Sequence, residues 1–119
     1  MFDAKVAIGT WSWGSGINGG DQVFGNHLTQ TDLQAVVDSA MTNGLNLWDT
    51  AAAYGQGSSE TILGNSLKAY NRDDYFLSTK FTPRFAGSGK NPVADMLAES
   101  LNRLHTDYVD LYWIHNAEG

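Results

Sequence analysis

The sequence predicts an α/β fold built on a parallel sheet, because apolar segments of strand length alternate with segments of helical periodicity. Four strands are expected, at residues 5–11, 45–48, 74–81 and 108–115, with three helices between them. Strands that alternate with helices form parallel sheets with right-handed crossovers. The repeat length fits either a doubly wound sheet or a barrel, and periodicity alone does not decide between them.

The first strand, Lys5–Trp11, is a short apolar run that ends in glycine and aromatic residues, a pattern typical of a buried strand. A loop with several glycines follows, from Ser12 to Gln30. This loop is longer than most connections, which favours a functional or partly mobile segment.

The first helix is expected to have Thr31 as its N-cap, with Gln34 placed for a capping box, and to end at Gly44. Its apolar face would consist of Leu33, Val36, Val37, Ala40 and Met41.

The second helix would be capped by Ser58 or Ser59, with Glu60 in its first turn to complement the helix dipole. The third would begin at Asn91, an N-cap followed by Pro92 at the first helical position. The apolar stripes of these helices are Ile62, Leu63 and Leu67 in the second, and Met96, Leu97, Leu101 and Leu104 in the third.

The composition suits one globular domain over residues 1–119, with 42% hydrophobic residues. There is no cysteine, which excludes disulfides and thiolate metal sites, and no metal is expected. Neither a membrane-spanning apolar run nor a signal peptide is found, so a cytoplasmic location is expected. The net charge of −6 argues against nonspecific nucleic-acid binding.

Residues Gly14–Gly19 match the pattern G-x-G-x-x-G after a strand, and Asp49 ends the next strand, as in a dinucleotide-binding fingerprint. That fingerprint requires the glycines to open a helix whose N-terminus holds the pyrophosphate. Because the next helix is expected only near Thr31, a Rossmann site is disfavoured. A flexible loop over a pocket is the preferred interpretation.

Four polar residues stand at or near the ends of expected strands, namely Asp49, Tyr54, Lys80 and His115. In a parallel sheet they would gather at one rim, and the carboxyl ends of barrel strands are where chemistry occurs. A lysine beside a phenol stabilises the phenolate, a carboxylate holds the lysine, and an imidazole can bind a substrate oxygen. Together they predict a proton-transfer site.

Each of the four residues alone also has a structural explanation. The acid could cap a turn, the phenol could pack on the second helix, the amine could reach solvent, and the imidazole could end a strand with its bonds satisfied. Only their shared rim favours the functional interpretation. The remaining candidates are expected to be structural, namely Asp107 and Asp110, or exposed, namely His27 and His105.

Five segments carry distinctive motifs in a consistent order. Gly9–Trp11 ends the first strand, Trp48–Gly55 contains D-T-A-x-x-Y-G, and Ser59–Gly64 contains S-E-x-x-L-G. Ser78–Lys80 places a lysine in the third strand, and Ser100–His115 fits S-L-x-R-L-x-x-D-Y-[VI]-D-L-Y-x-x-H. Together these segments resemble the aldo/keto reductase family over nearly the whole chain.

This resemblance implies a (β/α)8 barrel that uses NADPH to reduce a small aldehyde or ketone. Tyr54 would donate the proton to the carbonyl oxygen, Lys80 paired with Asp49 would support the tyrosine, and His115 would orient the carbonyl. The resemblance also implies a nicotinamide site near Thr10, Trp11 and Asp49. Trp48 stands where the family commonly has phenylalanine, and the loop from Ser12 to Gln30, with Trp13 and Phe24, could wall the substrate side.

The chain differs from this family in length, because such a barrel needs about 250 residues. The sequence supplies strands one to four, so the expected structure is a half-barrel, the amino-terminal half. It would lack most of the residues that hold the cofactor, and it would depend on the missing half or self-associate. Two alternatives to a reductase are a half-barrel that is inert or serves in assembly or cofactor sensing, and a barrel glycosidase. The glycosidase is disfavoured because only one good acid lies at the rim.

Overall fold

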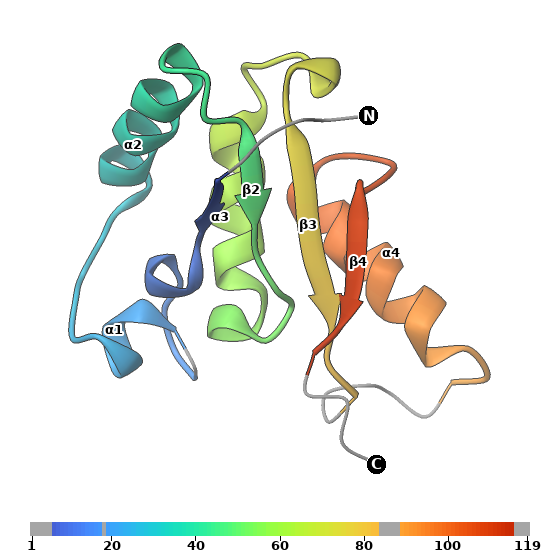
Figure 1. Ribbon diagram of the computed structural model, residues 1–119. Coiled ribbons are helices and arrows are strands. Elements are labelled where there is room, and N and C mark those ends of the chain that lie inside the picture. Colours follow the sequence, from blue (N-terminus) through green and yellow to red (C-terminus); the bar gives the residue numbers. More distant parts are fainter. Residues whose placement is uncertain (1–5, 18, 84–88, 116–119) are drawn as a thin grey trace.

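The computed structural model describes residues 6–17, 19–83 and 89–115 (Figure 1). Its centre is a parallel sheet with the strand order β1-β2-β3-β4, so each strand pairs with its neighbours in sequence. The strands are β1 (Ala7–Gly9), β2 (Leu47–Asp49), β3 (Phe76–Phe81) and β4 (Leu111–Ile114). The helices that connect them are α2 (Gln30–Thr42), α3 (Ser58–Leu67) and α4 (Pro92–Leu104). The predicted alternation of strands and helices is therefore confirmed.

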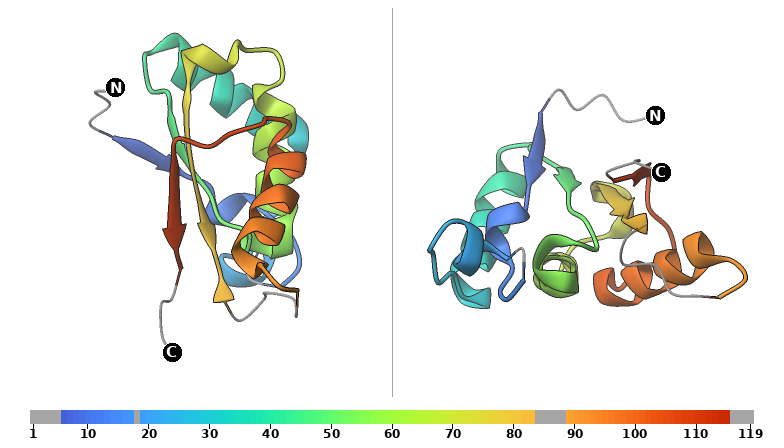
Figure 2. Two further views of the ribbon diagram at one scale, coloured as in Figure 1. Left: turned by 90° about the vertical axis from the view of Figure 1, so that its right-hand side faces the viewer. Right: turned by 90° about the horizontal axis from the view of Figure 1, so that it is seen from below.

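The three connecting helices cover the same face of the sheet, and the right-hand view of Figure 2 shows the sheet curving above them. In the part of the chain that the structure describes, the other face carries no helix. A doubly wound sheet has helices on both faces, whereas a barrel has them only on the outside. The arrangement is therefore that of a partial (β/α) barrel, and the bare face is the side that lines the interior of such a barrel.

The strands are shorter than predicted. β1 stops at Gly9 because the chain turns into a 3₁₀ helix, η1 (Trp11–Trp13), and another, η3 (Arg72–Asp74), occupies the expected start of the third strand. The prediction of a buried first strand is wrong, since Ala7 and Gly9 are exposed. The reason is that β1 is an edge strand with one uncovered face. Lys5 lies outside the described residues.

Two predicted helix starts are wrong. The N-cap of α2 is Thr29, whose side chain accepts a hydrogen bond from the Asp32 amide, while the Asp32 carboxylate accepts one from the Thr29 amide. The capping box therefore lies two residues before the expected one at Thr31. The N-cap of α3 is Gly57, with a φ of 97°, and not Ser58 or Ser59.

The predicted cap of α4 is confirmed, whereas the C-cap of α2 is Asn43, one residue before the predicted Gly44. Asn91 caps α4 by accepting a hydrogen bond from the Ala94 amide, and Pro92 is the first helical residue. Gly44 follows α2 with a φ of 79°, the left-handed conformation that glycine adopts after a helix.

The core lies between the sheet and its helices and contains Trp13, Leu33, Val37, Trp48, Leu63, Leu67, Tyr75, Leu77 and Leu104. Trp13 packs edge-on against Trp48 with 6.0 Å between ring centroids, so the proposal that Trp13 walls a substrate site is wrong. Val36 was expected in the core but is 44% exposed, because the buried stripe of α2 follows Leu33, Val37 and Ala40.

The loop after β1 contains a one-turn helix, α1 (Gly20–Val23), directly after the glycine motif. The expectation that no helix starts before Thr31 is therefore wrong. The motif is nevertheless hydrogen-bonded to the residues that follow it. The Gly16 amide donates to the Asp21 carboxylate at 2.9 Å, and the Gly14 carbonyl accepts from the Gly20 amide at 2.6 Å. These amides are engaged within the loop, so the Rossmann interpretation gains no support.

Candidate active site

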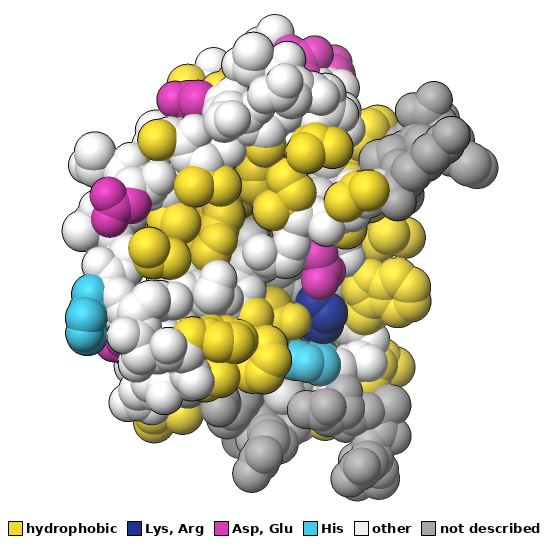
Figure 3. Space-filling view, turned by 60° about the vertical axis from the view of Figure 1, so that its left-hand side comes forward, with side chains coloured by type: hydrophobic (Ala, Val, Ile, Leu, Met, Phe, Trp, Pro, Cys, Tyr) yellow, Lys and Arg dark blue, Asp and Glu magenta, His cyan; other side chains and the backbone are white. Residues whose placement is uncertain are grey.

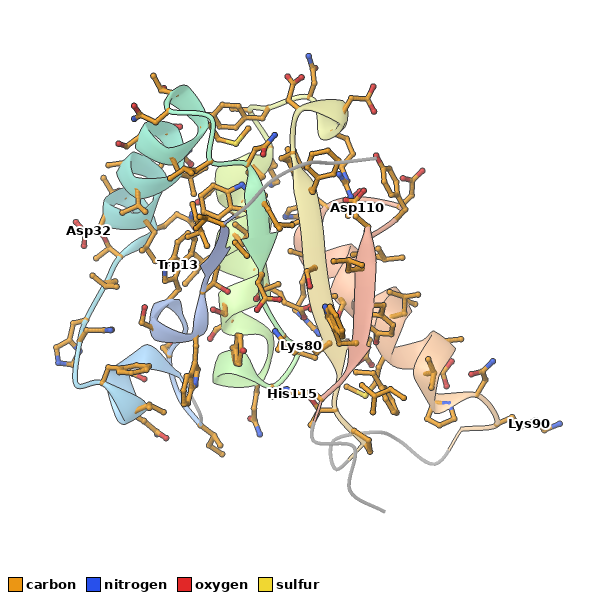
Figure 4. All side chains as sticks on the ribbon, viewed as in Figure 1. Trp13, Asp32, Lys80, Lys90, Asp110 and His115 are labelled. Carbon is orange, nitrogen blue, oxygen red and sulfur yellow. The ribbon has the colours of Figure 1, made fainter. Side chains whose placement is uncertain are left out.

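The carboxyl ends of the strands bring the four predicted residues together. Asp49 is the last residue of β2, Lys80 is the residue before the last of β3, and His115 directly follows β4. Tyr54 begins the 3₁₀ helix η2 (Tyr54–Gly57) in the turn after β2. In Figure 4, Lys80 and His115 lie near each other at this end of the sheet, while Asp110 lies at the opposite end.

The Lys80 ammonium is the centre of the cluster. Its Nζ donates to Asp49 Oδ2 at 2.9 Å, to the Thr50 carbonyl at 2.8 Å, and to Tyr54 Oη at 3.3 Å. An ammonium has three protons, and these three acceptors match them. Asp49 and the Thr50 carbonyl therefore fix the cation beside the phenol.

The ring of Tyr54 is held by its neighbours. Trp11 stacks on it with ring centroids 6.1 Å apart, and His115 meets it edge-on at 5.8 Å. The chain turns sharply after Tyr54, because Gly55 and Gln56 both have a positive φ. A Cβ at Gly55 would come within 2.0 Å of Ser58 Oγ, so only glycine fits there.

His115 faces the cluster as a partly buried imidazole. Its Nδ1 lies 3.4 Å from Thr82 Oγ1, and its amide donates to the Phe81 carbonyl at 2.7 Å. Burial lowers the pKa of His115 below its ordinary value, and the positive charge of Lys80 lowers it further, while Asp49 opposes both effects. His115 is therefore neutral at neutral pH, and its ring can donate one hydrogen bond and accept another.

A family model described as "Aldo/keto reductase family" matches residues 5–119. The chain belongs to the aldo/keto reductase family. It is 34% identical to aldo-keto reductase YhdN of Bacillus subtilis, a match that covers 94% of this chain and 34% of that protein. It is 39% identical to L-galactose dehydrogenase of Arabidopsis thaliana, over 81% of this chain and 31% of that protein. The chain thus spans about a third of the length of these relatives.

Solved structures of the family have the same fold. The thermostable aldo-keto reductase Tm1743, in complex with epalrestat, superposes with a TM-score of 0.76 at 30% identity, covering 92% of this chain and 37% of that one. An aldo-keto reductase of Klebsiella pneumoniae in complex with NADPH gives 0.70 at 31% identity, covering 92% and 34%. These likenesses establish the barrel type that the sequence pattern left open.

The residues that the family resemblance assigns to the cofactor differ in exposure. Thr10 is fully buried, and its hydroxyl donates to the Asp49 carbonyl at 3.2 Å, so it secures the end of β2. Trp11 is 46% exposed and carries Phe24 edge-on at 5.1 Å on its ring. Trp11 and Phe24 therefore form an aromatic wall beside Tyr54.

The bare face of the sheet is hollowed beside the cluster. A hollow of about 290 Å³ is lined by Asp49 and Lys80 together with Ala7, Leu47, Ser78, Leu111 and Trp113. On this side Figure 3 shows an acidic, a basic and a histidine side chain next to one another among hydrophobic side chains. A larger hollow, about 520 Å³, lies between α3 and α4 at the opposite end of the strands, far from these groups. The smaller hollow is the one that adjoins the candidate catalytic residues Asp49 and Lys80.

Sequence reasoning missed the role of Glu60. It lies in the first turn of α3 as expected, but it is also fully buried and accepts hydrogen bonds from Thr79, Ser100 and Arg103. The available signal was the pairing of one acid in the S-E motif with the arginine of the S-L-x-R-L motif. The structural assignment of Asp110 is confirmed, because it pairs with Arg72, and His27 and His105 are exposed as expected.

Within the described ranges, no group of acidic residues and histidines is arranged to hold a metal ion. The helices of that part of the chain are all too short or too polar to cross a membrane.

Proposed function

We propose that residues 1–119 form the amino-terminal half of a barrel that uses NADPH to reduce an aldehyde or ketone to an alcohol, and that they supply its proton-transfer residues. The observation that carries this proposal is the Tyr54 hydroxyl 3.3 Å from the Lys80 ammonium, with Asp49 bound to the same ammonium. Family membership and the relatives crystallised with NADPH or NADP support it.

The residues at the rim suit the nicotinamide end of the cofactor. The exposed ring of Trp11 and the hollow beside Asp49, whose lining is mainly apolar apart from Asp49 and Lys80, offer surfaces that an amide-bearing aromatic ring can contact. When bound, NADPH would supply the hydride. The rest of the barrel would hold most of the cofactor, including its adenosine phosphate.

In this scheme Tyr54 donates its hydroxyl proton to the oxygen of the substrate carbonyl. Lys80 hydrogen-bonds the phenol oxygen and stabilises the negative charge left on it, while Asp49 keeps the ammonium in place. His115, neutral at neutral pH, donates a hydrogen bond to the same carbonyl oxygen and orients it. A proton donor and an oriented acceptor are thus assembled before the substrate binds.

The test is Tyr54→Phe in the full-length barrel. Carbonyl reduction should fall by about 10²–10⁴-fold, the range that positioned proton donors contribute, whereas NADPH affinity should stay close to that of the wild type. Tyr70→Phe is the matched control, because Tyr70, which follows α3, donates its hydroxyl to Asp38 of α2 and lies away from the cluster. Unchanged turnover in Tyr54→Phe would remove the role given to this residue.

A non-catalytic assembly or cofactor-sensing module is the second candidate. One relative, 30% identical over 81% of this chain and 31% of its own length, is named "Probable voltage-gated potassium channel subunit beta" of Oryza sativa subsp. japonica. That name describes a subunit and not a reductase. NADPH binding by the full-length barrel, followed by fluorescence and without turnover of any carbonyl tested, would favour this candidate.

The isolated 119-residue chain should be inactive, and it should self-associate or require the remaining strands. Large apolar side chains are exposed at both edges of the sheet. Val6, just before β1, is 56% exposed, and Trp113 and Ile114 of β4 are 53% and 65% exposed. Exposed edges and apolar faces of this kind promote association. Light scattering tests this expectation, and a dilute monomer that melts cooperatively would contradict it.

A further inference from the structure

Behind the active site, a buried carboxylate joins three elements. Glu60, in the first turn of α3, is fully buried. Its Oε2 accepts a hydrogen bond from Thr79 Oγ1 of β3 at 2.6 Å, and its Oε1 accepts one from Ser100 Oγ of α4 at 3.0 Å. Arg103 of α4 donates to Oε1 twice, from Nε at 2.8 Å and from Nη2 at 2.6 Å. The carboxylate is thus satisfied only when α3, β3 and α4 are correctly placed.

This network reaches Lys80 through the backbone of β3. Thr79 directly precedes Lys80, and successive strand residues point to opposite faces of a sheet. Thr79 therefore points toward the helices and Glu60, while Lys80 points toward the bare face and Tyr54. Holding the Thr79 hydroxyl fixes the position of β3 at the residue next to the ammonium.

The same network reaches Tyr54 through Gly57. The Arg103 side chain lies against this residue so closely that a Cβ on Gly57 would come within 2.8 Å of Arg103 Cδ and Nε. Gly57 ends the turn that begins at Tyr54, and its carbonyl accepts a hydrogen bond from Thr61 Oγ1 at 3.0 Å. The turn that carries the phenol therefore rests on the guanidinium that Glu60 holds.

We infer that Glu60 and Arg103 are positioning residues, which set the separation of Tyr54 from Lys80 from the helix side of the sheet. A buried ion pair is weak support for stability, because apolar residues of similar volume often serve as well. The catalytic rate is more sensitive than stability to the placement of the reacting groups, since a displacement of about 1 Å can lower it by about 10²-fold. The inference rests on the proposed function for its kinetic consequence, although its structural consequence is independent of turnover.

The decisive comparison is Thr79→Val against Thr79→Ser in the full-length barrel. Valine keeps the shape and removes the hydroxyl that Glu60 accepts, whereas serine keeps the hydroxyl. Thr79→Val should lower kcat by about 10-fold or more with NADPH affinity within about twofold of the wild type, and Thr79→Ser should restore kcat. Glu60→Gln should act in the same direction as Thr79→Val. Asp110→Asn is the control, because it weakens an ion pair at the other end of the strands and should lower stability without lowering kcat.

Crystal structures of the two Thr79 variants give a readout that needs no activity. The distance from Tyr54 Oη to Lys80 Nζ should lengthen in Thr79→Val and stay near 3.3 Å in Thr79→Ser. An unchanged distance, or an unchanged kcat in a Thr79→Val protein whose melting temperature has fallen, would overturn the inference. A wild-type barrel that reduces no carbonyl, together with a lengthened distance in Thr79→Val, would refute the proposed function and leave the positioning role intact.

Discussion

Each end of the sheet carries an ion pair of the same length in different surroundings. Lys80 pairs with Asp49 at the carboxyl ends of the strands, and Arg72 pairs with Asp110 just before β3 and β4, both with 2.9 Å between nitrogen and oxygen. Lys80 and Asp110 are labelled at opposite ends of the sheet in Figure 4. The side chains of the two pairs are also buried to a similar extent, 16% and 30% exposed in the first and 17% and 20% in the second.

The two cations differ in what else they bind. The Arg72 guanidinium donates to Thr106 Oγ1 and to the carbonyls of Tyr75 and Tyr108, and it lies 3.9 Å from the centre of the Tyr108 ring. Asp110 also accepts the Leu77 amide at 2.9 Å. The planar guanidinium of Arg72 therefore binds backbone and aromatic groups, and it joins the starts of β3 and β4 through them. Lys80 gives one of its three hydrogen bonds to a phenol at the open rim.

Neither the length nor the burial of an ion pair therefore reveals its role. In barrels the carboxyl ends of the strands carry chemistry, while the amino-terminal ends contribute stability. The Arg72 pair fits the second description because its partners are mostly structural. The Lys80 pair ends on an ionisable hydroxyl and, under the proposed function, fits the first.

The largest expected contrast comes from removing each cation in the full-length barrel. Lys80→Met should lower kcat/KM by about 10²–10⁴-fold and should lower the free energy of unfolding by less than Arg72→Met, since besides Asp49 and Tyr54 the Lys80 ammonium bonds a single backbone carbonyl. Arg72→Met should lower the free energy of unfolding by about 2–4 kcal/mol, because several partly buried acceptors lose their donor, and should leave kcat near the wild-type value.

Steady-state kinetics and urea unfolding of the same preparations would measure both effects. If folded Arg72→Met lost as much kcat as Lys80→Met, the two ends of the sheet would not differ in role.

The sequence could predict those features of the fold and the candidate site that have a periodic or positional signal. Alternating apolar runs located the four strands, and the common direction of parallel strands was enough to expect Asp49, Lys80 and His115 at one rim. Apolar spacing also found most of the buried stripe of each long helix. None of these inferences needed a contact between distant side chains.

The rest depended on tertiary contacts that have no local signature. Two Thr-x-x-polar patterns compete at Thr29 and Thr31, and the structure uses the first, while Gln34 of the second donates to the Ser66 carbonyl in α3. Ser58 looked like a cap, but its hydroxyl bonds the backbone of Ser15 in the loop after β1. Trp13 sits in a glycine-rich segment typical of a surface loop, yet it is 6% exposed because it packs on Trp48. The engagement of Glu60 likewise follows from the meeting of α3 with α4.

A smaller effect is expected from Arg72→Lys, which sharpens the comparison by keeping the charge. Lysine cannot reproduce the planar fork or the stacking on Tyr108, so the free energy of unfolding should fall by about 1–3 kcal/mol, with kcat unchanged. Asp49→Glu, which keeps the charge at the other end, should do the reverse and lower kcat with little loss of stability. Chemical denaturation and kinetics of both variants measure this. Equal losses of stability in the two would contradict the assignment of anchoring to the Arg72 end.

The smallest expected effect is a pH dependence of stability that belongs to the Lys80 end of the sheet. Burial and Lys80 lower the pKa of folded His115 below its ordinary value of 6.5. Below about pH 6.5 the unfolded chain therefore takes up a proton that the folded chain does not. The free energy of unfolding falls as the pH drops from 6.5 toward the lowered pKa of the folded chain. Above pH 6.5 His115 causes no such loss of stability.

Urea unfolding at pH 7.5 and pH 5.5 should show a larger loss of stability in the wild type than in His115→Gln, whereas His27→Gln, at an exposed position, should behave as the wild type. The same loss in His115→Gln as in the wild type would mean that the imidazole is not shielded by the cluster. In that case neither burial nor the charge of Lys80 would act on His115 in the folded chain.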